Sequence, residues 1–581
     1  MKEVVNHIYK QRQEYIIIGL TGKIGSGCTT AADFLVNKVE DFMLPEMSIS
    51  EGSNDNRRKK NIIQKFYQKN WSGFRKICVR DIITTFVLSN KFEELVDYVH
   101  KKISKDLDIN FLREEYEEKS KENAEFLCVL EKIKEKREIS IDEAALVSEY
   151  MSKKLPTFST TIKRGLSVES YRQFSKSFQL FGDNIRRSGC AIIDTFDPSK
   201  IYSIAERINY VIKALKTLNN TKSQKNYFVI DAFRNPFESM FFKERYSAFY
   251  LMAIKSPESD RHNRLTKQLD LNTSQIEAQD KKEEPSGSPL DNIEIFVSQN
   301  IAACIDKADI HINNEGEYGS EKFLELKGRL VTYISLIQHP GLITPERDEK
   351  LMQVAYTAKL NSGCISRQVG AVVTNSHGAI VSIGWNDVPE GQTQCLLRNM
   401  EHLRSGTDPN SYSEYEKTNI DFKSVVNEKL ALIRDRDQLK GRGLAFCFRG
   451  FQNQIKKDKN QVHTRSLHAE ENAFLQIVKH GGQGVKNGTL YTTASPCELC
   501  AKKAYQLGIK RIVYIVPYPG IAVPHVIKCG TNQPTMSIFS GAIGQAYSKL
   551  YDPIFPYKDE LEAFYSQAAE IQAAEIGVGP R

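Results

Sequence analysis

The sequence predicts an α/β protein built from two domains, and three observations carry this prediction. The chain has 581 residues, which is more than one hydrophobic core usually organises. Near the N-terminus an apolar run, a glycine-rich turn and a helical pattern follow one another, and the C-terminal part contains a strand hairpin followed by two helical patterns. We expect domains at residues 1–338 and 339–565 and a peripheral tail at 566–581.

The composition is that of a folded chain without membrane segments. Hydrophobic residues make up 40% and charged residues 26%, which excludes a disordered or membrane class. The net charge of +8 is a mild basic excess, and it suits an anionic small substrate as well as a nucleic acid. The sequence shows neither a long apolar run nor a secretory leader, so we expect a cytoplasmic protein with no membrane partner.

The first domain begins with the sequence EYIIIGLTGKIGSGCTTAADFLV, which reads as strand, turn and helix. A charged segment at about 50–180 shows helical periodicity and is expected to be a helical insertion. Apolar runs at 227–231 and 247–254 predict further strands, and ADIHINN predicts the last one. The polar segment at 256–292 is expected to be a mobile lid or insert.

The turn after the first strand has the spacing of a phosphate-binding loop. Its sequence GKIGSGCT leads into a helix, where backbone N–H groups can hold phosphates. Cys28 stands where such loops carry a lysine, so that cation is missing. Lys23 either replaces the charge or points outward, and both readings stay open. The expected nucleotide contacts are Gly22, Lys23, Gly25, Ser26, Gly27, Cys28, Thr29 and Thr30.

The second domain carries a metal-binding pattern. His468-Ala469-Glu470, followed by Pro496-Cys497-Glu498-Leu499-Cys500, is the pattern of zinc-dependent nucleobase deaminases. One imidazole and two thiolates leave the fourth position of Zn²⁺ open for water, as a catalytic site requires. Glu470 would stand beside the metal and move a proton from the attacking water to the base. We expect both halves of the pattern to lie at helix starts, where thiolates are favoured.

The remaining elements of this domain surround the pattern. A helix is expected at 347–359, and QVGAVVTNSHGAIVSIGWN is expected to form a hairpin. The stretch at about 400–460 is charged and lacks clear periodicity. Its segment FCFRGFQNQIKK, which includes Phe446, is the local candidate for aromatic stacking on a polynucleotide.

The motifs of the second domain, in their order, resemble the deoxycytidylate deaminase family. The resemblance covers about 350–550 and rests on QVGAVV, GWNDVP, HAEENA and SPCELCAKKAYQLGIKRIVY. It implies a sheet between helices (an αβα cytidine-deaminase-like domain), hydrolytic deamination of dCMP or dCTP, and a homo-oligomer. The stretch between Pro389 and His468 is expanded relative to the family, which leaves the number of substrate phosphates open.

The same resemblance implies substrate contacts. Asn386 should hydrogen-bond the sugar, although a plain turn residue explains it equally well. Tyr518 should lie against the nucleotide. Ser366 or Arg367 should meet the phosphate, and a solvated surface charge is the alternative for Arg367.

The first domain resembles the small P-loop nucleotide kinases, which implies a parallel sheet. The resemblance places Asp231 at a Walker B strand end and Arg261 and Arg264 in a lid, where a plain helix surface is the alternative. It implies a nucleoside triphosphate, with or without Mg²⁺, at the loop. The fusion of the two domains resembles the bacterial antiphage deoxycytidylate deaminases, which implies nucleotide-pool depletion and a regulatory small RNA as partner.

The sequence therefore predicts a zinc-dependent deaminase of deoxycytidine nucleotides controlled by the N-terminal loop domain. A polynucleotide cytidine deaminase is the chief alternative, and it would need a basic groove with exposed aromatic rings. A housekeeping deaminase fused to an active nucleotide kinase is a second alternative, disfavoured by Cys28. An RNA-binding module with an inactive enzyme is disfavoured because the zinc pattern is complete.

Overall fold

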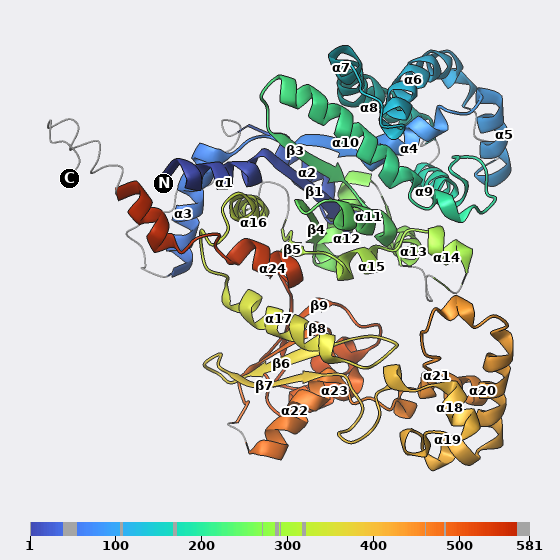
Figure 1. The fold of residues 1–581 in the computed structure, drawn as a ribbon, viewed down its shortest axis with the longest axis vertical. Coiled ribbons are helices and arrows are strands. Elements are labelled where there is room, and N and C mark those ends of the chain that lie inside the picture. The colour runs from blue at the N-terminus through green and yellow to red at the C-terminus, as the bar shows by residue number, and fades with distance from the viewer. Residues whose placement is uncertain are drawn as a thin grey trace. The chain divides into compact units, whose positions relative to one another are not determined.

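The computed structural model divides the chain into two compact units. The described residues are 2–38, 55–104, 109–166, 171–269, 271–284, 290, 292–316, 321–458, 460–481 and 484–565. The first unit comprises residues 1–345 and 545–581, and the second comprises residues 346–544. Each unit contains a sheet covered by helices, as Figure 1 shows.

The end of the chain packs with the first unit, so this division differs from the domain boundaries expected from the sequence. The backbone N–H of Gly341 donates to the carbonyl oxygen of Leu550 at 2.9 Å, and the Tyr9 hydroxyl donates to Glu560. Residues 545–565 belong to the first unit because their hydrogen-bonding partners lie there. The expected C-terminal tail lies outside the described residues.

A parallel sheet forms the centre of the first unit. Within this unit the strands lie in the order β5-β4-β1-β3-β2, and every neighbouring pair is parallel. The central strands are buried along nearly their whole length, as is typical of a sheet covered on both faces. The strands are β1 (Tyr15–Thr21), β2 (Arg75–Cys78), β3 (Asn226–Asp231), β4 (Phe249–Lys255) and β5 (Ile310–Asn313).

Helices pack on this sheet and form a further helical region after β2 (Figure 1). Part of the segment expected to be a helical insertion, RKIC at 75–78, instead forms the strand β2, which is too short to show a strand pattern. The helices are α1 (Lys2–Glu14), α2 (Cys28–Val36), α3 (Asp55–Asn70), α4 (Val79–Val87), α5 (Phe92–Lys102), α6 (Arg113–Lys134), α7 (Ile141–Glu149), α8 (Leu155–Leu166), α9 (Tyr171–Ser188), α10 (Ser203–Thr221), α11 (Pro236–Arg245), α14 (Ile293–Val297), α15 (Ile301–Asp306), α16 (Glu321–Gln338) and α24 (Gly544–Tyr551).

The polar segment expected to be a mobile lid contains two helices, α12 (Glu258–Leu269) and α13 (Thr273–Glu283). A capping box begins α13, because the Asn272 side chain accepts from Gln275 N–H and the Gln275 side chain accepts from Asn272 N–H. Leu265 and Ile276 are buried together between the two helices. The cap and the small apolar contact stabilise helices that the polar composition did not indicate.

The second unit has a five-stranded mixed sheet in the order β10-β9-β8-β6-β7. Strands β8, β9 and β10 are parallel, and β6 is antiparallel to both β7 and β8. The expected hairpin corresponds to β6 and β7. The elements are α17 (Arg347–Ala358), β6 (Gly370–Thr374), β7 (Ile380–Trp385), α22 (Ala469–His480), β8 (Thr489–Ala494), α23 (Glu498–Gln506), β9 (Arg511–Val516), β10 (Thr535–Ile538) and β11 (Gly541–Ala542).

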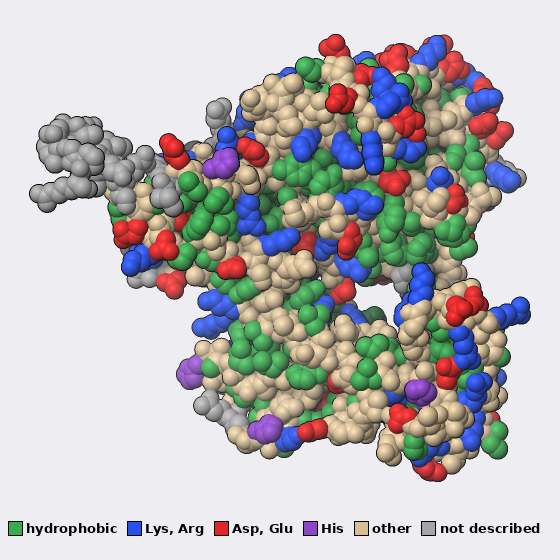
Figure 2. All heavy atoms as spheres, viewed as in Figure 1, with side chains coloured by type: hydrophobic (Ala, Val, Ile, Leu, Met, Phe, Trp, Pro, Cys, Tyr) green, Lys and Arg blue, Asp and Glu red, His purple; other side chains and the backbone are tan. Residues whose placement is uncertain are grey.

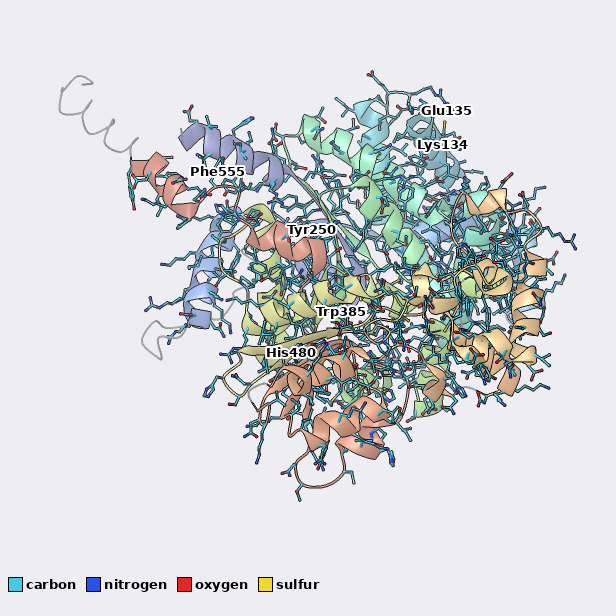
Figure 3. The ribbon with its side chains drawn as sticks, turned by 60° about the horizontal axis from the view of Figure 1, so that its bottom comes forward. Lys134, Glu135, Tyr250, Trp385, His480 and Phe555 are labelled. Carbon is cyan, nitrogen blue, oxygen red and sulfur yellow. The ribbon has the colours of Figure 1, made fainter. Side chains whose placement is uncertain are left out.

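Two glycines allow helices to approach this sheet closely. A Cβ at Gly370 would lie 2.0 Å from a carbonyl oxygen of α17, and a Cβ at Gly384 would lie 2.3 Å from the carbonyl oxygen of Ala469 in α22. Gly384 pairs with Ala371, the neighbour of Gly370, so the two contacts lie on opposite faces of the sheet. The sheet is therefore covered by helices on both faces. In Figure 3 the labelled Trp385 and His480 mark the ends of β7 and α22.

The stretch at 400–458, which we call the insert, folds around its own small core. Aromatic and aliphatic side chains that include Phe422 and Phe446 are buried together there, and the rings of Phe446 and Phe451 stack with centroids 5.4 Å apart. The absence of clear periodicity reflects short helices joined by turns. They are α18 (Met400–Ser405), α19 (Glu414–Thr418), α20 (Ile420–Leu432) and α21 (Phe448–Lys456).

The sequence led us to expect no membrane partner, and the helices can be checked for length and apolar character. None of the helices within the described ranges is both long and apolar enough to cross a bilayer.

The close approach at Gly384 should make that position sensitive to a single methyl group. Gly384→Ala would push α22, and with it His468, away from β7, because the contacting atoms are backbone and cannot rotate away. We expect the free energy of unfolding to fall by about 1–3 kcal/mol, measured by chemical denaturation, and the affinity for Zn²⁺ to fall as well. Gly443→Ala is the control, because a Cβ there meets no atom within 4 Å. Equal stability of the two variants would contradict the close packing.

Candidate active site and nucleotide loop

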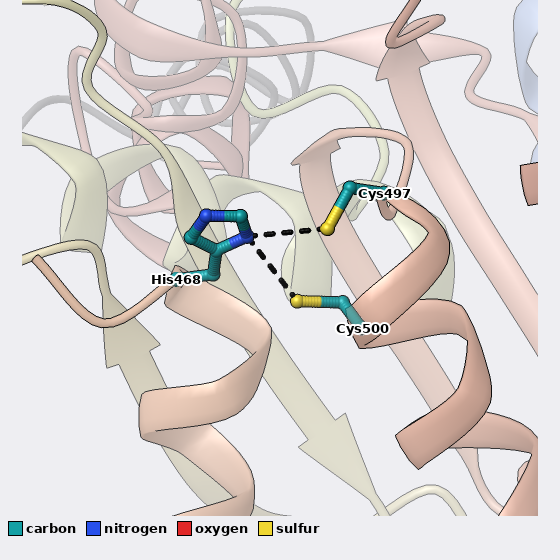
Figure 4. Close-up of side chains that lie close together, drawn as sticks. All are labelled: His468, Cys497 and Cys500. Carbon is teal, nitrogen blue, oxygen red and sulfur yellow. Dashed lines mark hydrogen bonds between the residues drawn. The ribbon is translucent and has the colours of Figure 1, made fainter. Parts of the chain in front are cut away.

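Three possible zinc ligands meet at the starts of two helices in the second unit. His468 is the residue before α22, Cys497 is the residue before α23, and Cys500 lies in the first turn of α23. The Nδ1 atom of His468 lies 3.3 Å from the Sγ of Cys497 and 3.4 Å from the Sγ of Cys500 (Figure 4). These ligand atoms all lie within 4.8 Å of one another. The fold thus brings together the three ligands predicted from the sequence.

The donor set fits a zinc ion. Tetrahedral Zn²⁺ with ordinary bonds to nitrogen and sulfur separates its ligand atoms by about 3.6–3.8 Å. The observed distances are only slightly shorter, so a small outward movement of the side chains would accommodate the metal. Three protein ligands leave one coordination position for water or substrate, which is the arrangement of a catalytic site.

The three groups also influence one another's protonation. A hydrogen bond from the Cys500 thiol, followed by one from His468, lowers the pKa of Cys497 to about 4. The same hydrogen bond and burial raise the pKa of Cys500, and the hydrogen bond to Cys497 raises the pKa of His468. One thiolate is therefore held ready for a cation, and metal binding would release the second thiol proton.

Glu470 is placed beside these ligands as a proton carrier. It lies in the first turn of α22, is 4% exposed and lines the same pocket as His468 and Cys497. Burial raises the pKa of Glu470 to about 7, and a bound cation would favour its charged form. A carboxyl group that titrates near neutrality can both accept and release a proton.

A cavity of about 220 Å³ opens over the ligands, and the expected substrate contacts line it. Asn386 is nearly buried, and its side chain is partly committed to the backbone. Its Oδ1 accepts from Val369 N–H at 2.6 Å, and its Nδ2 donates to the carbonyl oxygen of Arg367 at 2.7 Å. Asn386 therefore holds the loop before β6, and one amide hydrogen is left for a ligand.

The other expected contacts lie around the mouth of this cavity. The Tyr518 hydroxyl accepts from Gln461 Nε2 at 2.8 Å, and the guanidinium group of Arg367 lies 5.8 Å from the centre of the Tyr518 ring. Ser366 is exposed, and its hydroxyl lies 3.6 Å from the sulfur of Cys447. The fold brings these residues together, and their roles in binding remain predictions.

Sequence reasoning missed two further cations in this cavity. Arg449, at the start of α21, and Arg465, three residues before His468, both line it. Arg465 stands close to the zinc pattern and could have been noticed for that reason. Arg449 lies in the FCFRGFQNQIKK segment, which the sequence offered for its aromatic rings and not for its arginine, and only the folding of the insert brings it to the cavity.

The glycine-rich turn of the first unit has the backbone expected of a phosphate-binding loop. It follows β1 and leads into α2, which begins at Cys28. Gly25 and Gly27 have φ angles of +79° and +103°, which side chains disfavour. A Cβ at Gly27 would also lie 2.2 Å from Nδ2 of Asn314. Burial raises the pKa of Cys28 to about 12, so its thiol stays neutral and supplies no charge.

Asp231 lies at the end of β3, next to this loop. Thr29 Oγ1 donates to Asp231 Oδ1 at 3.4 Å, so the predicted loop threonine and acidic residue meet. Lys76, which the sequence did not single out, lies 3.3 Å from Asp231. Part of the loop and Asp231 line a cavity of about 650 Å³, which opens at the carboxyl ends of parallel strands, where ligands of such sheets bind.

Lys23 is paired with carboxylates, and whether it replaces the missing lysine at the loop stays a prediction. Its Nζ lies 3.1 Å from Glu284 and 3.6 Å from Glu258. The expected lid residue Arg264 lines the large cavity and donates to backbone carbonyl oxygens, at 2.6 Å for Gly316.

The second expected lid residue, Arg261, is buried among carboxylates. Its guanidinium group donates to Glu258 at 2.6 Å and also to Asp280. Glu258 and Asp280, together with His262, form a second group of possible metal ligands. Since Arg261 already supplies the positive charge between them, we assign no metal there.

Comparisons with known proteins find similarity over the second unit. Residues 345–516 match the family model for the cytidine and deoxycytidylate deaminase zinc-binding region. The deoxycytidylate deaminase of Enterobacteria phage T2 is 28% identical over 178 residues, which cover 29% of this chain and 79% of that protein. The deoxycytidylate deaminase of Enterobacteria phage T4 is 29% identical over 178 residues, which cover 29% of this chain and 77% of that protein. The matched family region contains the three ligands and Glu470.

A solved structure is also similar to part of the chain. The crystal structure of dCMP deaminase from the cyanophage S-TIM5, in complex with dCMP and dUMP, is 21% identical in sequence and covers 34% of this chain and 99% of that chain. Its TM-score of 0.21 is too low to support an inference.

Removal of one zinc ligand should empty the site. With two ligands left, Cys497→Ser or Cys500→Ser should weaken zinc binding by on the order of 100-fold or more, measured as zinc per chain after dialysis against a chelator. Cys529→Ser is the control, since Cys529 is exposed and lies outside the ligand group. Full zinc content in both ligand variants would refute the assignment.

Proposed function

We propose that this chain, a zinc-dependent hydrolytic deaminase through its domain at residues 345–516, converts deoxycytidine nucleotides to deoxyuridine nucleotides. The observation that carries the proposal is a group of three possible zinc ligands, two of which, His468 and Cys497, line one cavity with the buried carboxyl group of Glu470. The names of the phage relatives support deoxycytidylate as the substrate class. Asn386, Tyr518, Ser366 and Arg367 are the proposed substrate contacts.

The chain's own residues provide for the proton movements of the reaction. His468, Cys497 and Cys500 would hold Zn²⁺, which would supply an activated water as the nucleophile. Glu470 accepts a proton from that water and passes it to the ring nitrogen of the base and to the departing amine. The bond between C4 and the new oxygen forms, the bond to the amino nitrogen breaks, and ammonia leaves. Hydrolysis thus balances without a redox partner.

The surroundings of the site give little support to a polynucleotide substrate. Phe446 is 2% exposed, and the rings of Phe448 and Phe422 stack with centroids 5.2 Å apart. Phe446 therefore serves as core of the insert, whereas strand binding needs exposed rings. Phe448 is partly exposed and also lines the zinc-site cavity. On the face shown in Figure 2, Lys and Arg side chains are interspersed with Asp and Glu over the insert.

Glu470→Ala should separate metal binding from chemistry. Because Glu470 is not among the ligands, we expect about one zinc per chain to remain, while deamination of dCMP falls by on the order of 10² to 10⁴. Zinc content and ammonia release measure the two effects. Glu428→Ala, which removes an exposed carboxyl group in the insert, is the matched control. Near-normal turnover in Glu470→Ala would exclude the proposed proton carrier.

The proposal extends to control by the first unit. The backbone of residues 25–29 and the pair of Thr29 and Asp231 support binding of a nucleoside triphosphate, with Mg²⁺ near Asp231. The neutral Cys28 leaves the γ-phosphate without the usual lysine. We therefore expect the loop to bind a nucleoside triphosphate without transferring its phosphate. Bound nucleotide would bias the deaminase between two conformational states, typically by about 1–3 kcal/mol.

Gly27→Asp tests this control. The substitution places a carboxylate in the loop at a φ of +103°, against Asn314. We expect loss of ATP binding in calorimetry and loss of any ATP effect on deamination, with normal zinc content. Gly328→Asp is the control, because a Cβ at that helix position meets no atom within 4 Å.

Two outcomes would overturn the control by the first unit. The first is ATP-dependent phosphorylation of a nucleotide by the full-length chain, which would make the first unit an active kinase. The second is an unchanged ATP effect in a Gly27→Asp variant that no longer binds ATP. The implied role in antiphage defence, the homo-oligomer and the regulatory small RNA stay predictions.

A further inference from the structure

The carboxyl group of Glu283, the last residue of α13, lies against the glycine-rich loop of the first unit. Its Oε2 accepts from the backbone N–H of Ile24 at 3.1 Å, and its Oε1 accepts from the guanidinium group of Arg234 at 2.6 Å. The Glu283 side chain is fully buried, and it lines the same cavity of about 650 Å³ as the loop and Arg234. A carboxylate of the chain itself is therefore bonded to a loop N–H group and to a cation of this cavity.

Acidic side chains at α12 and α13 also neutralise two further cations beside the loop. Lys23, within the loop, lies 3.1 Å from Glu284, the residue that follows α13. Arg261 donates to Glu258 at 2.6 Å and also to Asp280. Cations around a cavity attract anionic ligands. Here carboxylates of the same two helices reduce that attraction.

Apolar and backbone contacts hold α12 and α13 directly on the loop. Ile24 packs against the buried side chains of Leu265 and Ile276, which belong to the two helices. A Cβ at Gly25 would lie 2.9 Å from Cγ of Leu265, and Arg264 donates to the carbonyl oxygen of Gly25 at 3.3 Å. Because this packing is close, a movement of α13 would be transmitted to the loop, and a ligand in the loop would act on α13.

A phosphate group and a carboxylate compete for the same partners. Both bind backbone N–H groups near a helix start, and both bind guanidinium groups. Two anions in one cavity also repel each other. A triphosphate in the loop would therefore meet the negative charge of Glu283 and find Ile24 N–H and Arg234 already bonded.

We propose that the acidic end of α13, above all Glu283, is an internal competitor for phosphate and holds the loop in a state of low affinity. Binding of a nucleoside triphosphate breaks the contacts of Glu283 with Ile24 and Arg234 and releases α13. The apparent affinity for the nucleotide is lowered by the small population of the released state. This inference rests on the proposed nucleotide binding at the loop and gives that binding an internal control.

Glu283→Gln removes the charge of this side chain and keeps its shape. We expect the full-length, zinc-loaded variant to bind ATP about 10-fold more tightly in calorimetry at fixed Mg²⁺ and ionic strength, since a competing charged hydrogen bond is lost. Inorganic pyrophosphate, which carries phosphates without a base, should gain by about the same factor. Glu277→Gln is the matched control, because it removes the same charge from an exposed position of α13.

The outcomes distinguish a competitor from a purely structural ion pair. A structural pair predicts equal or weaker ATP binding by Glu283→Gln, and that result, or a gain limited to ATP, would overturn the inference. If circular dichroism shows that Glu283→Gln is misfolded, Glu284→Gln decides. That change frees Lys23 at a half-exposed position, so ATP binding should tighten by about threefold, and no gain would count against the inference.

A double variant separates this inference from the proposed function. Gly27→Asp combined with Glu283→Gln should abolish the gain in ATP binding, and a gain that persists would place the ATP outside the loop and overturn the competitor role. ATP binding that is undetectable both in the wild-type protein and in Glu283→Gln would instead overturn the proposed nucleotide binding at the loop.

Discussion

The short distance between one imidazole nitrogen and two cysteine sulfurs is the constraint on which the second unit depends. His468 and Cys497 precede two different helices, so both helix starts must point at one place. The glycine at 384 permits this by letting α22 lie against β7 without an intervening side chain. Glu470, in the first turn of α22, then comes to the metal site through the same packing. The packing of α22 on β7 therefore positions both the metal ligand His468 and the proton carrier Glu470.

The first unit uses a helix start in a related way but without a metal. Its glycine-rich loop turns sharply after β1 and points backbone N–H groups of α2 into a large cavity. The chemistry differs because the cation usual in such loops is replaced by a neutral thiol, and Lys23 is engaged by Glu258 and Glu284. These features are the basis of the proposal that the loop binds a nucleotide without transferring phosphate.

The insert folds around a core of its own and also contributes a side chain to the zinc-site cavity. Its aromatic side chains face inward and form a small core, so its charged residues remain for the surface and for the cavity. Arg449 reaches the cavity because that core holds the start of α21 in place.

The sequence alone predicted the group of His468, Cys497 and Cys500, the nearby Glu470 and the glycine-rich turn before α2, because each is encoded by residues at short, fixed spacing along a turn or helix start. It also indicated the parallel sheet of the first unit, since buried strands are continuous apolar runs. Only the tertiary structure decided that Arg449 and Arg465 line the same cavity as Arg367. It also decided that Lys23 forms an ion pair with Glu284 and that β2 completes the sheet edge. Those features depend on contacts between residues far apart in the chain, and no local pattern of side chains records such contacts.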